Sequence, residues 1–489
     1  MDNFKNKLVK GFAWQASTKL FVQIFSWIST IWVARLLVPE DYGLVAMSGL
    51  VVGVFIMLAT TGFAAGVVNR VTISKEELDT VFWLSTFLGC FLYGIVFFIA
   101  DIAAEFYEED KLADIIKIAG LVVLLCAAKI VPSALALRAL DYKVISLNEM
   151  FGAFVQIIVT LSMAIMGYEY WSLIVGTIAS EAFMTLVYFI LYRYIPSFIF
   201  KIKLVLNLLY FGITLLFARS LKYVSGNIPI FLLSTHTSAA TTGHYQMAHT
   251  FGSLPSNKVG KLFSNLIFPA MSRIKNDKAL AKNTFLQMHT SLLFATGPMF
   301  IGLALVAEPL INIILTPAWL PIIVPFQAIC VIAIFQMSGL FITRAIEGLG
   351  EAAVSVKFQI YSIIICGPSM WFGVTNWGLN GMLAGWLLSS PIVYIYLLGK
   401  IAKKLDINLV EVLKMYLPLG ACLFFMCASV LGLLRFMFAE LSYIEQLIAS
   451  SLTGILVFFA AAYLFARPYL KSVKRAFFSA FKKETKSNV

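Results

Sequence analysis

Charged residues are scarce in this chain of 489 residues: they make up 13% of it, whereas hydrophobic residues make up 60%. A soluble domain normally has about a quarter of its residues charged, and one of this size cannot bury so much apolar surface. The low charge content therefore excludes a soluble enzyme, a disordered regulator and a secreted disulfide scaffold. It predicts a protein with many membrane-spanning segments.

Cysteine is also rare and unpatterned. The six cysteines all lie within apolar runs, and none forms a C-x-x-C motif, which favours small buried side chains over a metal or redox site. The sequence contains no P-loop, no G-x-S-x-G and no His, Cys or Asp cluster with metal-ligand spacing. We therefore expect neither an enzyme nor a bound cofactor or metal.

Long apolar runs are what the sequence has in abundance. A bilayer core of about 30 Å needs roughly 20 helical residues, and helices pair all their backbone groups internally, as lipid requires. The runs predict an all-α polytopic membrane protein with about fourteen transmembrane helices. The expected spans are 11–34, 43–67, 81–100, 112–137, 145–166, 170–192, 205–234, 242–268, 285–307, 321–343, 355–373, 379–399, 415–434 and 446–466.

Lysine and arginine predict the orientation. With the N-terminus in the cytoplasm, 27 of the 37 cations fall in cytoplasmic segments and 3 fall on the opposite side. This asymmetry follows the positive-inside rule, so the net charge of +12 does not indicate a nucleic-acid partner. Both termini are expected in the cytoplasm. The outer loops are expected to be short, and the longest, Asp101–Lys111, is acidic.

A weak internal repeat predicts two bundles. Gly43-Leu-Val-Ala-Met47 opens the second expected span, and Gly243-His-Tyr-Gln-Met247 opens the eighth, 200 residues later. Parallel repeats are a transporter architecture, so we expect two pseudo-symmetric six-helix bundles around a central cavity. The expected domains are a six-helix bundle over 1–195, a cytoplasmic linker over 196–204, a second six-helix bundle over 205–400, and two extra helices with a basic cytoplasmic tail over 401–489.

Two of the seven cations inside the expected spans share a helix face. Arg219 and Lys222 lie three residues apart near the middle of span 205–234. A charge inside the membrane is costly and by default functional, and an anion between the two cations would relieve their repulsion. We therefore consider them candidates for binding the phosphates of a substrate. Alternatively, they snorkel to the interface or pair with a carboxylate. Gly226 and Pro229 follow and are expected to bend or break the helix.

Other in-span charges are further candidates. Lys19 and Lys129, in the first and fourth spans, also suit the phosphates of a substrate. Glu181 lies at the centre of the sixth span. It either neutralises a lysine of the first or fourth span, or it couples transport to a proton or ion gradient. Lys117 is expected to pair locally with Asp114, three residues before it.

The eighth expected span carries two lysines and two histidines. Lys258 and Lys261 either line the cytoplasmic mouth of the cavity or snorkel to the interface. His244 and His249 lie five residues apart, about 140° around a helix, so we do not expect them to share a metal ion.

Four stretches of the sequence resemble one transporter superfamily, the multidrug/oligosaccharidyl-lipid/polysaccharide exporters. The match is to the polysaccharide transporter family of Wzx-type flippases, especially its colanic-acid and teichuronic-acid exporter branch. In span 205–234 the family often has an Asn-Ile/Leu-Asp, where this chain has Asn227-Ile228-Pro229. The matching stretches are ARLLVPEDYGLVAM, VPSALALRALDYKVISLNEM, GHYQMAHTFGSLPSNKVGKLFSNLIFPAMSRIKND and GLALVAEPLINIILTPAW.

The resemblance implies alternating access by two six-helix bundles. It implies a substrate of undecaprenyl-pyrophosphate carrying an oligosaccharide repeat unit, flipped across the bacterial inner membrane for lipopolysaccharide, capsule or exopolysaccharide assembly. A polysaccharide polymerase or chain-length machinery would then be a partner. Two alternatives stay open: a small-molecule antiporter of drugs or cations on the same fold, and a membrane polysaccharide polymerase or glycosyltransferase. The short outer loops argue against the second.

Overall fold

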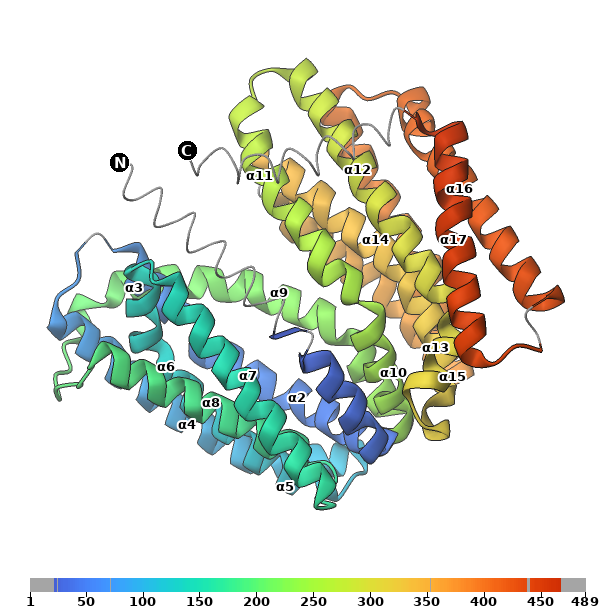
Figure 1. Ribbon diagram of the computed structural model, residues 1–489. Coiled ribbons are helices and arrows are strands. Elements are labelled where there is room, and N and C mark those ends of the chain that lie inside the picture. The colour runs from blue at the N-terminus through green and yellow to red at the C-terminus, as the bar shows by residue number, and fades with distance from the viewer. Residues whose placement is uncertain (1–21, 24, 71, 352, 438–439, 468–489) are drawn as a thin grey trace, which may run out of the picture. The chain divides into compact units, whose positions relative to one another are not determined.

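The structure is a computed structural model. It describes residues 22–23, 25–70, 72–351, 353–437 and 440–467, without the side chains of 64–65, 69, 206–215, 218, 257–258 and 261–262. Every regular element in this described part of the chain is a helix (Figure 1). The prediction of an all-α fold is therefore confirmed.

The chain forms two compact units, Met1–Gly243 and His244–Val489. This division follows contacts, whereas the expected domain boundaries follow the sequence repeat, so those boundaries stay a prediction. Unit 1 contains a helical segment at 25–36, then α2 (Pro39–Thr60), α3 (Phe63–Asn69), α4 (Lys75–Tyr107), α5 (Lys111–Ala119), α6 (Leu121–Arg138), α7 (Tyr142–Ile165), α8 (Trp171–Tyr192), η1 (Ile202–Leu204), α9 (Leu206–His236) and the first turn of α10 (Ala239–Gly252).

Unit 2 begins within α10. Its further elements are η2 (Ser256–Gly260), α11 (Lys261–Ile274), α12 (Lys278–Leu305), α13 (Ala307–Ile314), η3 (Pro317–Ile322), α14 (Ile323–Gly348), α15 (Ala353–Leu405), α16 (Leu409–Phe436) and α17 (Tyr443–Phe465).

Ten helical stretches among the described residues are long and apolar enough to cross a membrane. They account for eleven of the fourteen expected spans, because α15 contains two, divided by non-helical backbone at Trp377 and Gly378. Gly378 has a φ of 59°, which a residue without a Cβ adopts readily. Of the other three, span 11–34 lies partly outside the described residues, and α9 and α10–α11 occupy the remaining two. The polytopic prediction is thus confirmed.

Polar residues set several of the helix starts. At the start of α4 the Ser74 hydroxyl accepts a hydrogen bond from the Glu77 amide at 3.2 Å, and the Glu77 carboxylate accepts one from the Ser74 amide at 2.8 Å. This capping box satisfies backbone donors that a helix otherwise leaves unpaired. Asn408 with Glu411 begins α16 in the same way, and Ser442 with Glu445 begins α17.

One expectation about helix ends is wrong, and one is wrong in part. The acidic outer loop expected over 101–111 is mostly helical, because α4 continues to Tyr107 and α5 begins at Lys111. The expected break at Pro229 does not occur, because α9 stays helical to His236, whereas the alternative, a bend there, stays a prediction. In both places the long helix keeps backbone groups paired, which outweighs the local preference of acidic residues or proline for its end.

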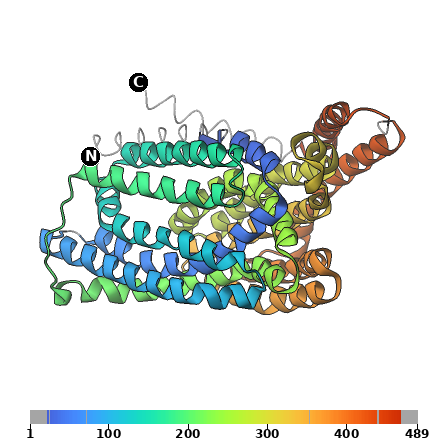
Figure 2. The same ribbon diagram turned by 90° about the horizontal axis from the view of Figure 1, so that it is seen from below.

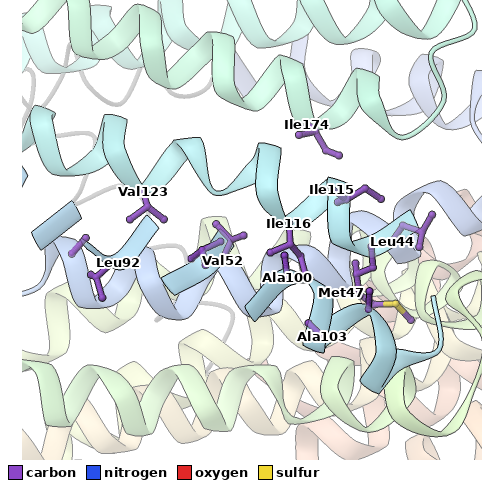
Figure 3. Close-up of a cluster of buried hydrophobic side chains, with 14 of the residues drawn as sticks. Leu44, Met47, Val52, Leu92, Ala100, Ala103, Ile115, Ile116, Val123 and Ile174 are labelled. Atoms are coloured by element: carbon purple, nitrogen blue, oxygen red, sulfur yellow. The ribbon is translucent and has the colours of Figure 1, made fainter. Parts of the chain in front are cut away.

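The core of unit 1 lies between α2, α4, α5, α6 and α8 (Figure 3). Leu44 and Met47 of α2 meet Ile115 and Ile116 of α5 there, and all four are at most 1% exposed. Small residues of α4, such as Ala100, let these helices approach closely, as is typical of membrane bundles.

Unit 2 has its own core. Its centre is formed by α12, α14 and α15, and α16 and α17 pack together beside α12 (Figures 1 and 2). Phe294 of α12, Met426 of α16 and Phe458 of α17 are among the buried residues that join these helices. The two C-terminal helices thus contribute to the core of unit 2.

The expected linker and the residue Tyr194 just before it pack against α4. The Tyr194 hydroxyl donates to Oδ1 of the fully buried Asp79 at 2.9 Å, and the Trp83 indole donates to the Ser197 carbonyl at 2.9 Å. Burial raises the pKa of the Tyr194 hydroxyl above its ordinary value, so it stays protonated and able to donate. Lys201 adds an ion pair with Glu76 at 2.8 Å. The segment that leads into α9 is therefore held against α4.

The repeat glycines meet each other within unit 1. A Cβ on Gly43 of α2 would lie 1.8 Å from the carbonyl oxygen of Ala239, in the first turn of α10. A Cβ on Gly243 would lie 1.8 Å from the carbonyl oxygen of Pro39. Helix α2 begins at Pro39, and α10 begins 200 positions later, at Ala239. Each glycine therefore meets the first residue of the other helix, so the two contacts are reciprocal. This pseudo-two-fold crossing supports the duplication that the motif predicts.

Candidate functional site

Lys129 and Glu181 meet inside unit 1. Lys129 comes from α6 and Glu181 from α8, two helices that pack together, and the Lys129 ammonium donates to Oε2 of Glu181. Each side chain is only about one-fifth exposed, at 20% and 21%. The Cys126 thiol, one turn before Lys129, lies 3.8 Å from the same oxygen. Glu181 therefore neutralises the lysine of the fourth span, as one of its two expected roles requires.

Arg219 and Lys222 form an exposed cationic pair on α9. Both residues are exposed, and neither has an acidic partner among the residues that the structure describes. Arg219 donates a long hydrogen bond of 3.5 Å to the Thr61 hydroxyl. Two cations on one helix face that lack a counter-charge favour an anion, and the guanidinium fork suits a phosphate. We call Arg219 and Lys222 the α9 cation pair.

The α9 cation pair and the Lys129–Glu181 pair are separate features. No hydrogen bond or ion pair within the described part of the chain joins them. Lys19 lies outside the described residues, so its expected role stays a prediction. The same holds for Lys258 and Lys261, whose side chains are not described.

The prediction that Lys117 pairs with Asp114 is wrong. Lys117 of α5 pairs with Asp101 of α4 at 2.6 Å rather than with Asp114 of its own helix. Because α4 extends beyond its expected end, it brings Asp101 alongside α5. A contact between neighbouring helices thus replaces the local pair that the spacing suggested.

A buried polar network in unit 2 has no counterpart in the sequence analysis. His289 Nε2 lies 2.6 Å from the Ser338 hydroxyl, which donates to the Tyr394 hydroxyl at 3.2 Å. Tyr394 in turn contacts the Tyr416 hydroxyl, so the network joins α12, α14, α15 and α16. His289 is fully buried, and its ring stacks on the ring of Phe341, with the two ring centroids 5.3 Å apart. A charge there would be costly, so this neutral network holds helices together.

Unit 2 also contains an apolar cavity of about 550 Å³. Pro298 and Met299 of α12, Val430 of α16 and Gly454 of α17 are among its lining residues. Its walls suit a hydrocarbon chain rather than a polar solute. The sequence alone does not predict this cavity, because its walls come from three different helices, α12, α16 and α17.

Two compact helical units, with ten helical stretches among the described residues that are long and apolar enough to cross a membrane, define a multi-pass membrane protein. The chain belongs to the family described as polysaccharide biosynthesis protein, whose profile matches residues 32–324. The family expected from the four sequence motifs is confirmed.

Two curated relatives agree with this assignment, and a solved structure has a similar fold. The chain is 23% identical over 397 residues, 80% of each chain, to the lipopolysaccharide biosynthesis protein WzxC of Escherichia coli (strain K12). It is 20% identical over 346 residues to the teichuronic acid biosynthesis protein TuaB of Bacillus subtilis (strain 168), covering 69% of this chain and 70% of TuaB. Its fold is similar to the lipid II flippase MurJ in an inward closed conformation, with a TM-score of 0.73 and 16% identity over 93% of this chain and 99% of MurJ.

Proposed function

We propose that the protein is a flippase that moves undecaprenyl-pyrophosphate-linked oligosaccharide repeat units across the bacterial inner membrane by alternating access. The observation that carries this proposal is the α9 cation pair, which is exposed on a helix of an expected membrane span and has no acidic partner among the described residues. A pyrophosphate is the part of such a substrate that needs cations within the membrane.

The relatives support the proposed substrate class. WzxC and TuaB are named for the biosynthesis of a lipopolysaccharide and of teichuronic acid, and MurJ is a flippase of lipid II. We propose that this protein serves lipopolysaccharide, capsule or exopolysaccharide assembly. Both termini then lie in the cytoplasm, and a polysaccharide polymerase or chain-length machinery takes up the flipped units.

The Lys129–Glu181 pair supplies a mechanism for coupling. The Lys129 ammonium is paired with Glu181, so a phosphate that draws it away would leave the carboxylate without its counter-charge. Protonation of Glu181 would compensate for that loss. We therefore propose that Glu181 couples substrate binding at Lys129 to a proton or ion gradient.

The apolar cavity of unit 2 suits a lipid chain. It lies between α12, α16 and α17, and apolar side chains dominate its walls. Burying hydrocarbon there costs little, because lipid and cavity are equally apolar. The cavity would therefore hold a polyprenyl chain without binding it tightly.

A cation or drug antiporter is the alternative function on the same fold. Such a transporter attracts cationic substrates, for which exposed carboxylates suit the membrane region better than exposed cations. The α9 cation pair repels that class of substrate. Unchanged sensitivity of a deletion strain to toxic cations would agree with this reasoning.

Replacing Arg219 tests the proposal directly. In a deletion strain, Arg219→Ala is expected to reduce polymer export at least about tenfold, since a charge-assisted hydrogen bond contributes about 1.5–3 kcal/mol. Lipid-linked repeat units should accumulate in the cytoplasmic leaflet, where their accessibility to an added glycosidase can be measured. Arg219→Lys keeps the charge but loses the fork, so we expect an intermediate export level.

An exposed arginine at the end of α16 provides the matched control. Arg435→Ala removes the same side chain far from α9 in the sequence and is expected to leave export unchanged. Normal export by Arg219→Ala, present in the membrane at the wild-type amount, would remove this residue from the substrate site.

A further inference from the structure

The aromatic residue next to the α9 cation pair makes an unusual contact with α2. The Tyr223 hydroxyl donates to the backbone carbonyl of Leu50 at 2.8 Å and lies 3.3 Å from that of Gly49. Both carbonyls belong to α2, so a side chain of α9 reaches the backbone of its neighbour. A tyrosine hydroxyl within a membrane bundle needs such a partner.

This contact requires the glycine at position 53. A Cβ on Gly53 would lie 2.4 Å from the Tyr223 hydroxyl oxygen and 3.2 Å from the ring. Real Cβ atoms do not approach an oxygen so closely, so any larger residue at 53 would displace the hydroxyl. Gly49, one turn earlier on α2, has nothing within 4 Å of its Cβ position. Gly53 thus forms a notch for Tyr223, whereas Gly49 does not.

Tyr223 stands where it can set the direction of the cation pair. It follows Lys222 directly and lies four residues after Arg219, one turn along α9. The segment that precedes α9 makes its own contacts with α4, a hydrogen bond from Tyr194 and an ion pair of Lys201. The hydrogen bond from Tyr223 to α2 is a second contact, beside the cation pair, and it opposes rotation of α9 about its axis.

We propose that Tyr223 is a positioning residue for Arg219 and Lys222: its hydroxyl, seated in the notch left by Gly53, fixes the rotation of α9 so that both cations face the pyrophosphate. This proposal rests on the proposed function of the α9 cation pair. Without the hydroxyl bond the helix can turn, and the cations then spend part of their time directed away from the substrate.

The binding of undecaprenyl pyrophosphate to the purified full-length protein tests this role. Tyr223→Phe retains the ring and removes only the hydroxyl, and we expect it to raise the Kd about three- to tenfold, the range for one lost hydrogen bond. Gly53→Ala is expected to raise the Kd similarly. The two changes together should raise it less than the product of their separate effects, because both act through one hydroxyl.

Two references make the result decisive. Gly49→Ala adds a methyl group on the same helix without a contact, and it is expected to leave the Kd unchanged. Arg219→Ala reports on the site itself. If Arg219→Ala weakens binding while Tyr223→Phe and Gly53→Ala bind like the wild type, with or without a lowered unfolding temperature, the positioning role is overturned. If Arg219→Ala binds like the wild type, the proposed phosphate site fails, and the positioning role fails with it.

Discussion

Gly43→Ala is expected to lower the amount of folded transporter in the membrane, and its export activity, by at least about fivefold, because overpacking costs about 1–3 kcal/mol or more. The added Cβ would lie 1.8 Å from the backbone oxygen of Ala239. A side chain in its way could rotate aside, but a backbone carbonyl cannot. The two helices would have to separate, and their reciprocal contact at Gly243 would be lost as well.

Membrane-inserted protein and exported polymer in a deletion strain measure this effect. Gly243→Ala is expected to have the same effect, because its Cβ would lie 1.8 Å from the oxygen of Pro39. The double variant should be less impaired than two independent losses predict, since the first methyl group already separates the helices. Gly49→Ala, in open space on the same helix, should not reduce either quantity. Gly43→Ala behaving like Gly49→Ala would refute the close crossing.

Glu181→Gln is expected to destabilise the protein and to weaken the dependence of transport on pH. Removing one partner of a buried ion pair costs about 3–5 kcal/mol, and the one-fifth exposure of both side chains reduces this, so we expect about 2 kcal/mol. Without a group that can be protonated at this position, the proposed coupling is lost. Thermal unfolding and the pH profile of flipping measure the two effects.

A double-mutant cycle isolates the pair. Lys129→Met alone should destabilise the protein by a similar amount, whereas Lys129→Met with Glu181→Gln should cost less than the sum. The Lys117–Asp101 pair is the control, because its aspartate is 65% exposed. Asp101→Asn should therefore cost less than about 1 kcal/mol. A strictly additive cycle, or an unchanged pH profile in Glu181→Gln, would contradict the account of this pair.

Much of the fold is predictable from the sequence, because membrane helices depend on the length of an apolar run, which is a local property. Eleven of the spans that the apolar runs predict lie in membrane-length helices of the structure. The repeated glycine motif marks the crossing of α2 and α10. The end of α4 was not predictable from composition. Its acidic last turns resemble a loop, yet packing against α5 keeps them helical and gives Lys117 its partner, Asp101.

The candidate site is predictable as a set of charges but not as a set of pairs. In-span position alone indicates Lys129, Glu181, Arg219 and Lys222. Whether a cation is neutralised depends on which helices are neighbours, and α6 with α8 decides this for Lys129. Tyr223 could not be recognised for the same reason. Its role depends on a missing Cβ on another helix, and sequence spacing carries no such information.

Flipping by the purified protein in proteoliposomes tests the central claim most directly. A fluorescent undecaprenyl-pyrophosphate-linked oligosaccharide is placed in one leaflet, and the fraction that reaches the other leaflet is measured by quenching from outside. The account predicts rapid transfer by the wild-type protein and by Arg435→Ala, and transfer near the protein-free rate for Arg219→Ala with Lys222→Ala. No transfer by the wild-type protein, or equal transfer by the doubly substituted protein, would contradict it.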